Sequence, residues 1–189
     1  MIESFEKTRL AGSIAAGALD EVNSIIKPGI STSEIDRLCY QYINDHKAFS
    51  APLYYRGYPK SCCTSLNHVV CHGIPSEKIL NEGDIINVDV TAIKDGWHGD
   101  TSRMFVVGEC SIKAKKLIKT TYEAMMKAIQ TIKANANIGN IGFTIQKIVE
   151  AQGFSVVRDF CGHGIGKNFH ESPNVLHYGE ENTGQKLKE

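Results

Sequence analysis

Two aspartates that lie eleven positions apart carry the strongest chemical signal in this sequence. Asp89 belongs to the apolar, β-branched run INVDVT (86–91), and Asp100 belongs to HGDTS (98–102). A charged side chain is rarely tolerated among such neighbours unless a positive group neutralises it. If the intervening residues form a hairpin, antiparallel pairing brings both carboxylates to one side. The alternative is a turn or cap role for Asp100 and a solvent-facing Asp89, but the apolar flanks of Asp89 favour a divalent cation site.

Histidines beside glycines form the second group of candidates. His163 lies in CGHGIG (161–166), where glycines allow close backbone approach around an imidazole, which is a common metal ligand. His72 lies in CHGIP (71–75) and is ambiguous alone; its likeness to the His163 segment favours a function. His170 follows seven residues after His163 and could equally be a loop residue. The spacing of the remaining histidines carries no signal: His46, His68, His98 and His177.

Aromatic and thiol side chains precede His72 in the sequence. They are Tyr54, Tyr55, Tyr58 and Cys63. Such a group can line an apolar pocket, although an aromatic cluster more often belongs to a core.

The composition limits the classes of protein to consider. The chain has 189 residues, of which 42% are hydrophobic and 22% charged, as in a single globular domain. Lys+Arg and Asp+Glu are balanced at 21 each without a basic stripe, which argues against a general nucleic-acid binder. We find no secretion signal and no apolar run of about 20 residues, so we expect a cytosolic protein without a membrane segment.

Other sequence motifs are informative by their absence. The six cysteines form no CxxC pair, so we expect reduced thiols and neither a disulfide framework nor a zinc knuckle. No Walker loop, GxSxG elbow or HExxH helix occurs, which argues against a nucleotide-binding enzyme, a serine hydrolase and a zincin.

Helices and strands alternate along the chain in a pattern that can position these residues. Helical spacing predicts four helices: 5–26, a second opened by the capping box Ser31 to Glu34, 117–132 and 138–151. Extended segments are predicted at 49–55, 62–66, 69–71, 84–93, 101–107 and 154–157. The Asp95-Gly96 pair predicts a hairpin turn between the two runs that carry the aspartates.

The order of these elements repeats. A long helix, a shorter helix, a strand and a glycine-flanked histidine occur once with His72 and again with His163, which predicts two similar halves. In the first copy a hairpin follows, whereas Glu189 arrives before any hairpin in the second. We therefore expect a single domain over residues 1–189 that lacks a pair of C-terminal strands.

The four motifs, in this order, resemble a type I methionine aminopeptidase of the compact bacterial form. The motifs are CHGIP, NVDVT, GDTS and CGHGIG, and the likeness extends from about Phe5 to the last residue. The lack of an N-terminal extension and of a long insert favours this form over proline-dipeptidase relatives.

The resemblance implies an α/β (α+β) pita-bread fold with two pseudo-symmetric halves that hold two adjacent divalent metal ions. Asp89, Asp100 and His163 match metal ligands, with Asp100 bridging both ions. His72 and His170 match residues that hydrogen-bond the scissile amide and the tetrahedral intermediate. Tyr55, Tyr58, Cys63 and Phe169 match parts of a methionine pocket.

The implied activity is removal of initiator methionine from nascent chains by a cytoplasmic, monomeric enzyme that can meet them at the ribosome. The metal is cobalt, manganese, iron or zinc. Two further glutamates that family members use as ligands have no counterpart here, which implies impaired activity. The alternatives are a non-catalytic pita-bread module that binds a protein partner and a proline-specific or creatine-type relative.

Overall fold

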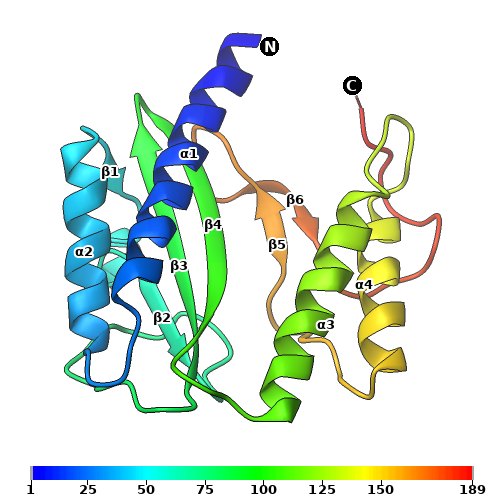
Figure 1. Ribbon diagram of the computed structural model, residues 1–189. Helices are drawn as coiled ribbons and strands as arrows, with labels where there is room; N and C mark the ends of the chain where they lie inside the picture. The colour runs from blue at the N-terminus through cyan, green and yellow to red at the C-terminus, as the bar shows by residue number, and fades with distance from the viewer. Residues whose placement is uncertain (1, 189) are drawn as a thin grey trace. The chain divides into compact units, whose positions relative to one another are not determined.

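The computed structural model describes residues 2–188, which form two compact units (Figure 1). Unit 1 contains the residues up to Ser111 together with Ile165–Phe169. Unit 2 contains Ile112–Gly164 and the residues from His170 onward. The segment 165–169 therefore belongs to unit 1, although the residues before and after it in the sequence belong to unit 2.

Two helices form one layer of unit 1. They are α1 (Ile2–Ile25) and α2 (Thr32–Asp45), and Pro28-Gly29 lies in the turn between them. The predicted capping box opens α2: the Ser31 hydroxyl accepts from the Glu34 amide at 3.2 Å, and the Glu34 carboxylate accepts from the Ser31 amide at 2.7 Å. This reciprocal pair satisfies donors that a helix start otherwise leaves open.

A four-stranded antiparallel sheet forms the other layer. Its strands are β1 (Phe49–Ser50), β2 (Cys63–Leu66), β3 (Ile85–Lys94) and β4 (Trp97–Val106). Strand β3 is central, with β4 along one edge and β1 and β2 along the other. Asp95 and Gly96 connect β3 to β4 with φ of 51° and 78°, the positive values that a tight hairpin turn requires.

The two faces of this sheet differ in chemistry because side chains alternate along each strand. Ile86, Val88, Val90 and Ala92 are fully buried in the core that the sheet shares with α1 and α2. At Gly99 the backbone of β4 passes so close to α1 that an added Cβ would overlap the backbone at Gly12. The opposite face, called the polar face below, carries Asp89 and Asp100, so the helical layer leaves it open for a site.

Unit 2 pairs two helices with a small two-stranded sheet. Its elements are α3 (Ile112–Ile129), α4 (Gly139–Ala151), β5 (Gly162–Gly164) and β6 (Glu171–Val175). Thr120, Ala124 and Ala128 are the buried residues of α3, and these small side chains permit close packing on α4. The short strand β5 carries His163.

Several sequence predictions are wrong in detail. Of the segment 49–55 only Phe49–Ser50 is a strand, and a 3-10 turn, η1 (Tyr55–Gly57), follows. Segments 69–71 and 154–157 form no strand. The Val69 amide instead donates a hydrogen bond to the Leu66 carbonyl, and the Phe154 amide donates one to the Val149 carbonyl. Helix α3 begins five residues before the predicted Leu117, at Ile112.

Two further properties concern the described part of the chain. None of its helices combines the length and the apolar character needed to cross a membrane. All six cysteines are free thiols.

Candidate metal centre

The two aspartates of the hairpin lie together on the polar face of the sheet. Asp89 is opposite Ser102, and Asp100 is opposite Thr91, so the carboxylates are diagonal neighbours across β3 and β4. Their side chains hydrogen-bond to each other. Asp89 is half-buried and Asp100 is exposed.

The pKa of Asp89 reflects this crowding. Burial, followed by the negative charge and the hydrogen bond of Asp100, raises it to about 7. At neutral pH Asp89 therefore tends to retain its proton, because burial and the negative charge of Asp100 disfavour its ionised form. A divalent cation placed between the two carboxylates would remove the repulsion between them, so this donor set fits a metal ion.

Thr91 orients one of the two carboxylates. Its buried side chain donates from Oγ1 to Asp100 Oδ1 at 2.7 Å. Hydrogen bonds of this kind fix the direction of a ligand and are a common feature around metal sites. The sequence analysis did not select Thr91, although its position two residues after Asp89 already placed it on the same face.

Cys63 borders the acidic pair on the side of β2, and Tyr58 hydrogen-bonds to Cys63. Cys63 is opposite Asp89 in the strand register and is buried. Burial and the nearby charges of Asp89 and Asp100 raise the pKa of Cys63 to about 11, against a lowering by its hydrogen bond with Tyr58. Cys63 is therefore a neutral thiol, which suits an apolar lining better than it suits a nucleophile.

The Tyr58 hydroxyl also contacts the loop that carries His72. Its oxygen lies 3.0 Å from the carbonyl oxygens of both Cys62 and Gly73. The Gly73 carbonyl in turn accepts from the Thr64 amide at 2.8 Å, and an added Cβ at Gly73 would overlap the Thr64 carbonyl. This close approach explains why residue 73 is a glycine. His72 itself is exposed and has a φ of 54°.

A second group of candidates meets at the turn end of the hairpin. The Phe169 ring lies 5.1 Å from the Tyr55 ring and 5.7 Å from the His98 ring, measured between centroids. His98 is buried, and its backbone amide donates to the Gly166 carbonyl at 2.8 Å. Sequence reasoning had dismissed His98, although its position two residues before Asp100 predicted the same face.

His163 and His170 come together within unit 2. Their ring centroids are 4.3 Å apart at an interplanar angle of 49°. His163 Nδ1 is 2.9 Å from the Gly164 carbonyl oxygen, and because a carbonyl can only accept, Nδ1 carries the hydrogen. In the neutral ring this leaves the lone pair on Nε2, the arrangement that orients a histidine for metal binding.

The structure thus groups the predicted residues into local sets. Unit 1 brings together Asp89 with Asp100, Tyr58 with Cys63, and Tyr55 with Phe169, while unit 2 brings together His163 with His170. Within neither unit do the described residues gather three or more His, Cys, Asp or Glu side chains in metal-binding geometry.

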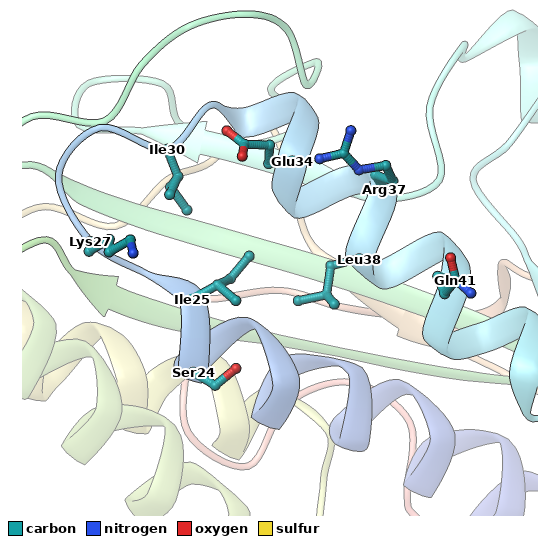
Figure 2. A pocket seen from close by; sticks show the side chains of 8 residues that line it. All are labelled: Ser24, Ile25, Lys27, Ile30, Glu34, Arg37, Leu38 and Gln41. Carbon is teal, nitrogen blue, oxygen red and sulfur yellow. The ribbon is translucent and has the colours of Figure 1, made fainter.

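A groove of about 560 Å³ lies elsewhere in unit 1, at the end of α1 and along α2 (Figure 2). Ile25 and Leu38 point toward each other between the two helices, and Lys27 and Arg37 lie on the rim. Its one carboxylate, Glu34, is already bound to Ser31. The groove belongs to the helical layer and contains none of the candidate site residues.

Comparison with known proteins links this geometry to a peptidase family. Residues 6–189 match metallopeptidase family M24. The chain is 52% identical over 187 residues to the methionine aminopeptidase of Rickettsia prowazekii (strain Madrid E), covering 99% of this chain and 72% of that protein. It is 54% identical over 188 residues to the methionine aminopeptidase of Escherichia coli (strain K12), covering 98% and 71%.

Solved structures give the same relationship. The crystal structure of the Rickettsia prowazekii methionine aminopeptidase matches with a TM-score of 0.99 at 52% identity, covering 100% of this chain and 76% of that chain. The methionine aminopeptidase of Thermotoga maritima matches with a TM-score of 0.97 at 37% identity, covering 100% and 76%. A prolidase from Pyrococcus furiosus, at 22% identity and a TM-score of 0.82, shares the fold over 100% of this chain and 54% of its own.

Proposed function

The chain belongs to metallopeptidase family M24 and has its pita-bread fold, and from this premise we propose that it acts as a metal-dependent methionine aminopeptidase. Its substrates would be the N-termini of newly made proteins, from which it removes the initiator methionine. The observation that carries the proposal is the Asp89 and Asp100 pair, whose mutual repulsion a divalent ion would relieve.

We assign the ligands of the metal ions to Asp89, Asp100 and His163. The polar face of the hairpin supports the two aspartates, and the Nδ1 hydrogen bond of His163 to Gly164 supports coordination through Nε2. When bound, divalent ions supply a water that is nucleophilic near neutral pH and polarise the carbonyl of the scissile amide. Thr91 would hold Asp100 in position for this role.

The histidines and the pocket residues are assigned to substrate binding. His72 and His170 would donate hydrogen bonds to the scissile amide and to the oxygen on which charge develops during the reaction. The pairs Tyr58 with Cys63 and Tyr55 with Phe169 would contact the methionine side chain, since aromatic rings and a neutral thiol suit a thioether.

This 189-residue chain spans 71–72% of the length of the two curated relatives. Cobalt, manganese, iron and zinc all suit ligands of this kind, two carboxylates and one imidazole. A monomeric state and action at the ribosome stay predictions.

The test is release of free methionine from a Met-Ala-Ser peptide, measured by chromatography with each of the four metals. We expect release by the wild-type chain and none by Asp89→Asn. Asp95→Asn, the same chemical change at the exposed hairpin turn, serves as the control. No release by the wild-type chain with any metal, together with a tight protein complex, would instead support a non-catalytic binding module.

A further inference from the structure

We propose that His98 is a positioning residue that fastens the segment 165–169 to the hairpin of β3 and β4 and thereby holds Phe169 against Tyr55. The role of this contact in methionine recognition rests on the proposed function. The fastening itself is a property of unit 1 and can be measured without any reaction.

The fastening consists of two hydrogen bonds to one carbonyl oxygen. The His98 backbone amide donates to Gly166 O at 2.8 Å, and His98 Nδ1 lies 3.2 Å from the same oxygen. Because the carbonyl can only accept, Nδ1 is the donor in the second contact. Both His98 and Gly166 are buried, so water is a poor replacement for either hydrogen bond.

The ring of His98 also supports Phe169. The two rings are stacked at an interplanar angle of 19°, and Phe169 meets the Tyr55 ring at 57°. Phe169 therefore contacts an aromatic ring on each of two separate segments of unit 1. A phenylalanine side chain at position 98 could stack on Phe169 but could not donate a hydrogen bond. An asparagine side chain could donate but could not stack, so the histidine side chain combines both functions.

A third contact comes from the neighbouring residue of β4. Lys167 Nζ lies 5.6 Å from the centre of the Trp97 ring, within the range of a cation–π interaction. Successive strand residues point to opposite faces, so the segment contacts the turn end of the hairpin from both sides through Trp97 and His98. In the sequence this segment lies between His163 and His170, and its last residue is the pocket candidate Phe169.

Trypsin cleavage after Lys167 measures the fastening directly, and Trp97, the single tryptophan, gives a second signal through its fluorescence. His98→Phe loses the side-chain hydrogen bond to Gly166, and His98→Asn loses the stacking on Phe169. In each variant we expect cleavage after Lys167 to accelerate about tenfold, the change for one lost contact of this kind. We also expect easier quenching of Trp97 by iodide. If both variants are cleaved and quenched like the wild type, the proposal is overturned.

His46 offers a matched control on α2. Its Nδ1 lies 2.8 Å from the Tyr42 carbonyl oxygen and its ring stacks on Tyr42 at 4.2 Å, but it is exposed and remote in sequence from the segment 165–169. His46→Asn should leave both signals unchanged. Equal acceleration in His46→Asn and His98→Asn would mean general loosening of unit 1 and would also overturn the proposal.

Kinetics then test the link to recognition. For the metal-loaded chain acting on Met-Ala-Ser, His98→Asn should raise KM about tenfold and change kcat less than about twofold, because the methionine contact weakens while the metal ligands stay in place. Equal losses in kcat and kcat/KM without a change in KM would overturn the recognition role. If the wild type shows no turnover, the proposed function fails, and cleavage after Lys167 alone decides the inference.

Discussion

Replacement of Asp89 by asparagine should stabilise the metal-free chain above neutral pH while it removes the response to metal. Asparagine has nearly the same shape as aspartate but cannot ionise, so Asp100 would no longer face a second negative charge. The fold therefore gains stability from a substitution that the proposed function cannot tolerate.

The magnitude follows from the pKa of Asp89, which burial and the Asp100 charge raise from 3.8 to about 7. Between these values the folded chain binds the proton more tightly than the unfolded chain does, so the contribution of this site to stability falls as pH rises. A shift of about three units at 1.36 kcal/mol each gives an upper limit of about 4 kcal/mol. Because Asp89 is only half-buried, we expect about 2 to 3 kcal/mol between pH 4 and pH 8.

Urea unfolding at several pH values measures this effect. The free energy of unfolding of Asp89→Asn minus that of the wild type should rise from pH 4 to about pH 7 and level off above it. Thermal unfolding with and without manganese measures the response to metal: the wild type should gain about 2.7 kcal/mol at a metal concentration of 100 times its Kd, and Asp89→Asn should gain much less.

Asp95→Asn controls for the change of one charge, since it makes the same substitution at an exposed turn position whose φ of 51° asparagine also accepts. Two results would refute the reasoning. One is a pH profile of Asp89→Asn that runs parallel to the wild-type profile, and the other is an equal gain from manganese in both proteins.

Three further substitutions test single contacts. Thr91→Val removes the hydrogen bond to Asp100 and should weaken metal binding about 10 to 100-fold, measured by calorimetry, with little change in the apo fold. Asp36→Ala should lower the free energy of unfolding in urea by about 2 to 3 kcal/mol, because Asp36 Oδ1 accepts from the amide and the hydroxyl of Ser61 at 2.8 and 2.6 Å. Ser31→Ala removes the side-chain half of the α2 capping box and should cost about 1 kcal/mol in thermal unfolding; a loss below about 0.3 kcal/mol would contradict the assigned cap.

Local sequence rules predicted much of unit 1. The capping box located the start of α2, and Asp95-Gly96 located the turn between β3 and β4. The alternation of side chains then placed Asp89 and Asp100 on one face of the hairpin. These features depend on residues close in sequence, whose spacing and backbone preferences act wherever the hairpin lies in the fold.

Predictions for short extended runs failed where a strand needs a partner. Val69 and Val70 have the composition of a strand, but the chain turns back at Leu66 and Val69 instead. Phe154 likewise continues the end of α4 through a hydrogen bond to Val149. A strand is stable only when another segment pairs with it, and composition does not show whether one is within reach.

By itself the sequence determined the chemistry available: two carboxylates on one hairpin face, glycine-flanked histidines and the family that shares these motifs. The tertiary structure alone decided that Asp89 has a pKa of about 7 and that His98 anchors Gly166 and stacks on Phe169. The reason is physical. Burial and charge at Asp89, like the contact between His98 and residues some 70 positions later, depend on segments brought together only by packing, which the spacing of residues along the chain does not specify.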